Sequence, residues 1–162
     1  HRLVMAGHRI VELPQALVRH GSRPRGAWLF YYQIRNRWHV ILKDYQVRTI
    51  VLLLPVLAVH ELLQATLLLL TGHGLTYVRA LGGLLAMLPS LPADRAAVAR
   101  FRKLADRDLL RSDPIVARDD FIRHPALRTG KRLYEHLLTS YWKLIRPLLP
   151  SLRPDPRSQP PQ

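Results

Sequence analysis

The chain has 162 residues, a formal net charge of +14 and a sequence pI of about 11.3. It contains no cysteine, which excludes disulfide bonds and thiolate metal sites. So basic a chain usually binds nucleic acid or an anionic membrane surface. Lys and Arg number nine in residues 1–48, one in residues 49–91 and fifteen in residues 92–162. Because the charge flanks an apolar block, the distribution favours a bilayer over nucleic acid.

The first segment with a clear pattern is residues 9–20, RIVELPQALVRH. Two short runs rich in Val, Ile and Leu are separated by Pro14, which predicts two strands, or one strand and an extended edge. Residues 21–26, GSRPRG, have the composition of a loop.

From Trp28 to Arg48, aromatic and aliphatic residues recur every three or four positions, which predicts a helix. Arginine and lysine form its other side. A helix of this kind commonly lies in the headgroup layer of a membrane, and the alternative is a helix that packs on a soluble domain. We therefore assign residues 23–48 to a loop and an interfacial amphipathic helix. The apolar stripe consists of Phe30, Tyr31, Ile34, Trp38, Ile41 and Tyr45, and the basic side of Arg35, Arg37, Lys43 and Arg48.

Residues 49–71, TIVLLLPVLAVHELLQATLLLLT, are long enough to cross a hydrocarbon core of roughly 30 Å as a helix. An uncharged turn follows, and residues 75–91 are apolar again, with Arg79 as their only charge. Basic flanks on both sides predict that residues 49–91 form a membrane hairpin with both arms in the cytoplasm. A single crossing followed by a helix in the membrane plane is the alternative.

Glu61 lies in the middle of the first apolar segment. An acidic side chain at that depth costs roughly 2.5–3.5 kcal/mol, so it should face protein, water or a polar lipid group. We expect it to be protonated or bonded to the partner helix, with a role in substrate binding as the alternative. His60 is adjacent and points about 100° away on a helix, which argues against a metal site there.

Residues 92–146 are predicted to be basic cytoplasmic helices, one over residues 94–110 and an amphipathic one over residues 127–146. Asp94 suits the first turn of the former. The sequence Asp106-Arg107-Asp108 looks like a metal-binding acidic motif, but its basic helical context favours surface salt bridges. Residues 147–162 are rich in proline, which predicts a disordered tail.

Two stretches resemble family 2 glycosyltransferases in order and spacing. Residues 6–22, AGHRIVELPQALVRHGS, resemble the segment that closes the nucleotide-sugar-binding domain of that family. Residues 30–45, FYYQIRNRWHVILKDY, resemble the aromatic-Arg-Asn block of its bacterial membrane-attached members, in which an apolar segment with an interior glutamate follows, as here. The resemblance covers roughly residues 1–112. The first stretch matches through Ala6-Gly7, Arg9-Ile10-Val11, Pro14 and His20-Gly21-Ser22.

This resemblance implies a mainly α chain in which residues 1–22 end a catalytic α/β domain, followed by amphipathic and transmembrane helices. It implies transfer of a sugar from a nucleotide-sugar donor to a cell-surface glycan or lipid-linked acceptor, usually with Mg or Mn. By position, His20 would lie near the metal and the diphosphate. Arg35 and Arg37 would contact diphosphate or lipid headgroups, with a solvated or headgroup-facing position as the alternative.

The family's acidic metal motif and general base have no counterpart in residues 1–162. We therefore expect the chain to be the carboxyl-terminal part of a bacterial cell-wall or polysaccharide enzyme, inactive alone. Its location would be the inner membrane, with the basic arms facing the cytoplasm and membrane lipid as a partner. The rival hypothesis is a non-enzymatic basic membrane adaptor that binds anionic lipid, nucleic acid or a protein partner.

Overall fold

The computed structural model describes residues 1–11, 13, 15, 26–110 and 125–151. These residues are mainly helical, and no strand occurs among them, so the expectation of a mainly α chain is confirmed. Within the segment 9–20, the described residues 9–11, 13 and 15 belong to no regular element. The remainder of that segment, including His20, lies outside the described residues. The chain forms two compact units, residues 1–104 and residues 105–162.

The first unit begins with a short helix, α1 (Arg2–Met5), that the sequence pattern does not predict. Met5 is completely buried. Its carbonyl oxygen accepts hydrogen bonds from the backbone N–H groups of Lys103 (2.8 Å) and Leu104 (3.3 Å). Gly7 follows in the left-handed region, with a φ of 85° that favours glycine. The start of the chain is thereby attached to residues that are distant in sequence.

The predicted aromatic-basic helix is confirmed as α2 (Trp28–Asp44). It ends earlier than the pattern indicates, because Tyr45 and Gln46 adopt extended backbone before α3 begins. The apolar helix α3 (Val47–Leu70) contains Pro55 and runs on past it. A turn with Gly72 at a φ of 78° follows, and His73 N–H donates to the carbonyl of Leu68 at 2.7 Å.

The second apolar segment forms α4 (Gly74–Leu85) and a 3-10 turn η1 (Leu88–Ser90). Helix α5 (Leu91–Phe101) follows directly and corresponds to the helix predicted over residues 94–110. Asp94 lies in the first turn of α5, as predicted, and its Oδ2 accepts a hydrogen bond from Ser90 Oγ (3.2 Å). The helix predicted to continue to residue 110 stops at Phe101 instead. Arg102 is extended and donates to the carbonyl of Asp44 (2.6 Å), so a tertiary contact takes precedence over helical continuation.

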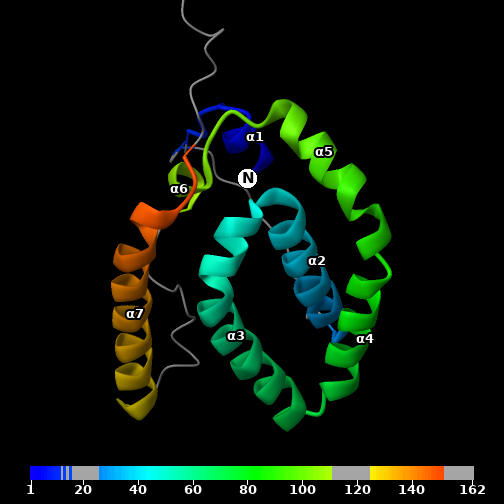
Figure 1. Ribbon diagram of the computed structural model, residues 1–162. Helices are drawn as coiled ribbons and strands as arrows, with labels where there is room; N and C mark the ends of the chain where they lie inside the picture. The colour runs from blue at the N-terminus through cyan, green and yellow to red at the C-terminus, as the bar shows by residue number, and fades with distance from the viewer. Residues whose placement is uncertain (12, 14, 16–25, 111–124, 152–162) are drawn as a thin grey trace, which may run out of the picture. The chain divides into compact units, whose positions relative to one another are not determined.

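Helix α2 lies between α3 and α4 in Figure 1, and its apolar stripe packs onto both. The centre of this core is fully or almost fully buried and consists of Ile34, Leu68 and Ala80. The partly buried side chains around it are Phe30, Tyr31, Trp38, Tyr77 and Leu81. The helical stripe read from the sequence is therefore the face that α2 turns toward its neighbours.

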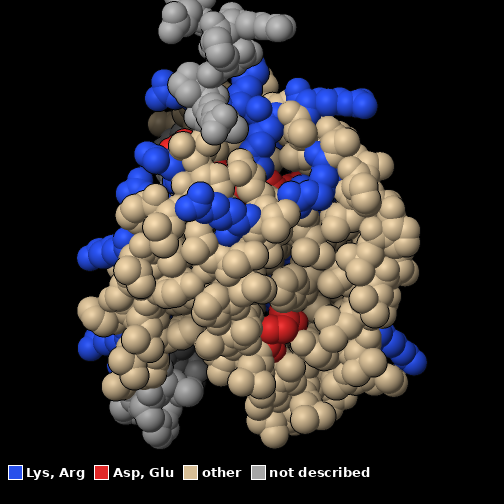
Figure 2. Space-filling view, in the orientation of Figure 1, with Lys and Arg blue, Asp and Glu red and all other residues tan. Residues whose placement is uncertain are grey.

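Two helical stretches are long and apolar enough to cross a membrane, Val47–Leu70 and Gly74–Phe101. On α3 many leucines point outward, and Leu62 and Leu70 are 69% and 80% exposed. Figure 2 shows a broad surface over α3 and α4 with few charged side chains. Exposed apolar surface of this extent is typical of contact with lipid or another protein.

The second unit contains α6 (Asp106–Leu109), α7 (Pro125–Ile145) and the 3-10 turn η3 (Arg146–Leu148). Helix α7 confirms the amphipathic helix predicted over residues 127–146. Within it, Lys131 Nζ lies 3.5 Å from Glu135 Oε1, one helical turn away. Most of the predicted disordered tail, residues 152–162, lies outside the described residues.

Candidate functional site: a polar cluster around Glu61

Glu61 is surrounded by polar groups from three helices. Trp38 Nε1 of α2 donates to Glu61 Oε2 (2.8 Å), and Tyr77 Oη of α4 donates to Glu61 Oε1 (2.9 Å). Arg37 Nη2 also donates to Oε2 and forms an ion pair with the carboxylate. Both oxygens of this carboxylate therefore accept hydrogen bonds from neighbouring helices.

Arg37 binds three side chains of α3 at once. Besides Glu61, its Nη1 donates to Gln64 Oε1 and lies 2.9 Å from His60 Nε2. A guanidinium only donates hydrogen bonds, so His60 Nε2 acts as the acceptor and the neutral ring carries its proton on Nδ1. His60, Glu61 and Gln64 are presented together because residues three and four apart share one side of a helix.

The cluster is partly shielded from solvent. The side chains of Arg37 and Glu61 are 25% and 17% exposed. Charges removed from water lose hydration, and this loss is offset only if they are paired and their remaining polar atoms are hydrogen-bonded. The contacts around Glu61 meet both conditions. The arrangement thereby joins α2, α3 and α4 within an otherwise apolar region.

Of the residues that the sequence singles out, the structure brings Arg37 and Glu61 together. Arg35 lies elsewhere on α2: its guanidinium stacks on the rings of Tyr32 and Tyr31, 4.8 Å and 5.2 Å from their centroids. His20 lies outside the described residues, so its predicted place near a metal stays a prediction. Within the described ranges, no group of three or more His, Cys, Asp or Glu side chains is arranged to hold a metal ion.

Three members of the cluster were not predicted from the sequence: Trp38, Gln64 and Tyr77. Trp38 was assigned to the apolar stripe, and Tyr77 lies in the second apolar segment, although buried Trp and Tyr usually need a partner for their polar atom. Gln64 follows Glu61 by three residues in an apolar run. This spacing places both side chains on one side of the helix and could have indicated that they belong to one polar cluster. The acidic sequence at 106–108 lies in α6, where Arg107 Nε is 3.8 Å from Asp108 Oδ1, in line with the salt bridging expected at the surface. Asp106 is completely buried, so the surface position expected for it is wrong.

No protein-family model, curated protein or solved structure matches the chain. Its function is therefore argued from the sequence motifs and from the contacts of the described residues.

Proposed function

We propose that this chain is the membrane-attachment portion of a glycosyltransferase that moves a sugar from a nucleotide-sugar donor to a cell-surface glycan or lipid-linked acceptor. Residues 1–22 would end the donor-binding α/β domain, and the two apolar stretches would place the enzyme at the inner membrane with its basic arms in the cytoplasm. A divalent metal, with His20 nearby, would bind the donor diphosphate in the whole enzyme.

One observation carries the proposal: two segments of the family resemblance meet in space. The aromatic-Arg-Asn block contributes Arg37 and Trp38, and the apolar segment contributes its interior acid, Glu61. These residues are more than twenty positions apart in the chain, and nothing in the resemblance required that they touch. Their contact gives a physical reason why such a block and such a glutamate would occur together.

The contact also suggests how the module would serve the enzyme. Membrane helices lack a strong hydrophobic drive to associate with one another and rely on packing and polar bonds. A carboxylate shared by α2, α3 and α4 would fix α2 relative to the membrane helices. Because α2 follows the end of the α/β domain in sequence, its fixed position would limit where the active site lies relative to the bilayer.

The test uses the whole gene product that contains this chain, in isolated membranes. We expect release of nucleoside diphosphate from at least one donor in a panel of UDP-, GDP- and dTDP-sugars, and loss of that release when EDTA removes divalent metal. Glu61→Ala should lower the release, whereas Arg79→Gln, which removes an exposed charge from α4, should not. If no donor in the panel is turned over, the enzyme proposal is wrong and the adaptor hypothesis gains support.

A further inference from the structure

We propose that the apolar helices of the first unit lie within one leaflet of the membrane, along its surface, and do not cross the bilayer. By length and composition, the stretches Val47–Leu70 and Gly74–Phe101 could cross. The contacts that α2 makes with α3, and the place where the chain begins, favour the arrangement along the surface. This inference rests on the membrane part of the proposed function and not on sugar transfer.

Helix α2 accompanies α3 from its beginning to its end. A two-residue link joins the end of α2 to the start of α3. Further along, Trp38 Nε1 donates to Glu61 Oε2 (2.8 Å). At the far end, the ring centroids of Phe30 and His73 are 5.3 Å apart, just after α3 has ended. If α3 crossed the bilayer, α2 would therefore cross it as well.

Helix α2 is too polar to cross a bilayer. On its outer side, Gln33 and Asn36 are exposed. Arg35 stacks on two tyrosines and has no carboxylate partner among the described residues. Charges and amides at the depth of the hydrocarbon are costly unless they face protein or water, so α2 belongs on the water side of the unit. The charged residues of α2 are Arg35, Arg37, Lys43 and Asp44.

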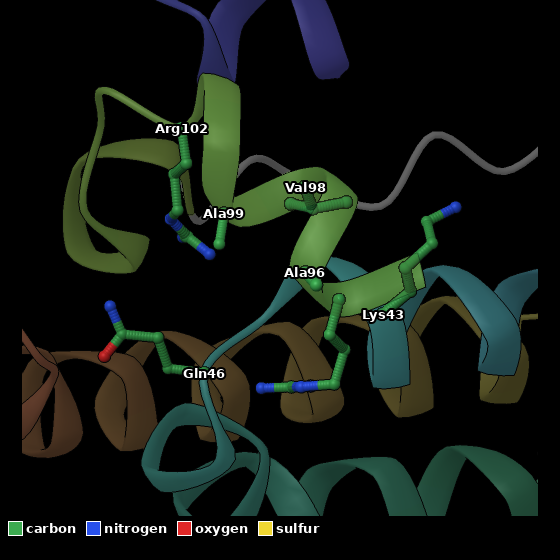
Figure 3. Close-up of a pocket in the computed structure, with 7 residues that line it drawn as sticks. Lys43, Gln46, Ala96, Val98, Ala99 and Arg102 are labelled. Atoms are coloured by element: carbon green, nitrogen blue, oxygen red, sulfur yellow. The ribbon is translucent and has the colours of Figure 1, made fainter. Parts of the chain in front are cut away.

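The start of the chain is attached at the end of α2. The ring centroid of His1 lies 5.5 Å from that of Tyr45, and the carbonyl of Met5 accepts a hydrogen bond from Lys103 N–H (2.8 Å). Helix α5 reaches the same end, where its residues line one cavity together with Lys43 (Figure 3). Helix α1, the end of α2 and the end of α5 therefore lie together.

Helix α2 begins at its other end, with Trp28, and its 17 residues are about 26 Å long. Residues 6–27 must connect the two ends, and they contain five charged residues and two prolines. Among them, residues 9–11, 13 and 15 belong to no regular element. Irregular backbone exposed to lipid does not cross the hydrocarbon, because its N–H and C=O groups would lack partners. Both ends of α2, and with them both ends of α3, therefore lie on one side of the membrane.

Helix α3 has a row of apolar side chains that suits contact with lipid. Val51, Leu62 and Leu69 are 56%, 69% and 71% exposed. Their spacings of eleven and seven residues place them within about 20° of one another on the helix. Glu61 and Gln64, which contact α2, point to the other side. We name Val51, Leu62 and Leu69 the lipid row, because in a helix parallel to the surface all three would enter the leaflet at one depth.

The charge around the apolar surface favours an anionic leaflet over a protein partner. Residues 47–101 contain three exposed arginines, Arg48, Arg79 and Arg100. Of the two acids in this range, Glu61 is paired with Arg37, and Asp94 lies 3.5 Å from His39. Exposed cations beside apolar surface are attracted to anionic headgroups.

The first experiment measures the depth of the lipid row. The chain contains no cysteine, so Val51→Cys, Leu62→Cys and Leu69→Cys can each carry one nitroxide label. The whole chain is placed in nanodiscs of phosphatidylethanolamine and phosphatidylglycerol, and collisions with oxygen and with a water-soluble nickel chelate are compared. We expect ratios that favour oxygen and agree within about twofold. In a crossing helix, Leu62 would lie deepest, and its ratio would be at least about fivefold higher than the other two.

The matched control is Asn36→Cys, on the outer side of α2. Its label should collide mainly with nickel, because α2 faces water. If α2 crossed the bilayer together with α3, this label would be shielded from nickel. Gln33→Cys, also exposed on α2, repeats the measurement if loss of the hydrogen bond between Arg35 and Asn36 lowers the helical content.

The second experiment compares the two ends of α3 in membrane vesicles. Val47→Cys and Thr71→Cys place a thiol at exposed positions at the start of the helix and just after its end. A maleimide that cannot pass the bilayer should label both from the same side. The comparison uses inverted and right-side-out vesicles that contain the whole chain.

Four results would overturn the proposal. A maximum at Leu62, or labelling of Thr71→Cys from the side opposite to Val47→Cys, would show a crossing helix. Labelling of Thr71→Cys from neither side would show a hairpin whose tip is embedded. Nitroxides in the lipid row that are shielded from both reagents would show that a protein or a second copy covers it, and ratios that favour nickel would show no lipid contact. No sugar donor is involved, so failure here is distinguishable from failure of the proposed enzyme activity.

Discussion

Helix α2 contacts its two neighbours in different ways. Toward α3 it presents charge and polar donors, and Arg37 and Trp38 bind Glu61. Toward α4 it relies on close approach: Ala80 is fully buried, and Gly83 of α4 faces Tyr31. The first contact selects its partner by charge and the second by size. In a membrane, where apolar surface alone discriminates poorly between helices, the two devices together define one arrangement.

We expect substitutions in the polar contact between α2 and α3 to lower the unfolding free energy more than substitutions in the contact between α2 and α4. Glu61→Ala leaves the Arg37 guanidinium, which cannot lose its proton, without its carboxylate. We expect the unfolding free energy of the whole chain to fall by about 3–5 kcal/mol, as measured by SDS titration in dodecyl maltoside micelles. Arg37→Met should cost less, because Glu61 can take up a proton and become neutral.

A double variant tests whether the stability losses at Arg37 and Glu61 both come from the ion pair between them. Arg37→Met with Glu61→Leu removes both charges and replaces them with apolar side chains. Its stability should exceed that of Glu61→Ala alone, since replacing a buried pair costs less than breaking it. Simple addition of the two single losses would mean that the ion pair does not couple α2 to α3.

The close contact between α2 and α4 should show a smaller effect that depends on position. A Cβ at Gly83 would lie 3.1 Å from Tyr31 Cζ and 3.2 Å from Arg35 Cδ, while a Cβ at Gly82 would meet nothing within 4 Å. Gly83→Ala should therefore cost about 1–3 kcal/mol through overpacking. Gly82→Ala should be neutral or stabilising, because alanine favours a helix. Equal effects in the same SDS titration would contradict the close packing.

The smallest effect is expected at Arg35, two residues from Arg37. Arg35 stacks on two tyrosines and hydrogen-bonds to Asn36 Oδ1 at 3.0 Å, and it makes no contact with α3 among the described residues. Arg35→Gln should lower stability by about 0.5–1 kcal/mol, the usual strength of an exposed cation–π contact. A loss as large as that of Arg37→Met would show that charge on α2, and not the contact with Glu61, stabilises the unit.

The helices that are set by local sequence spacing could be predicted from the sequence. Periodicity of three and four indicated α2 and α7, and the length of the apolar run indicated α3, because helical faces are set by sequence spacing. The positions where helices end were predicted less well. The break at Tyr45 and the stop after Phe101 coincide with bonds from Arg102 and Lys103 to residues more than fifty positions away.

The sequence by itself determined that Glu61 should face protein, water or a polar lipid group, since an acidic side chain in an apolar segment is costly to expose to lipid. Only the tertiary structure decided that Glu61 pairs with Arg37 of α2, because the choice depends on how each helix is rotated and where the helices cross. The orientations of Arg95 and Arg102 have the same origin. Both residues are plain in the sequence, but each guanidinium is directed by a backbone carbonyl at the end of α2.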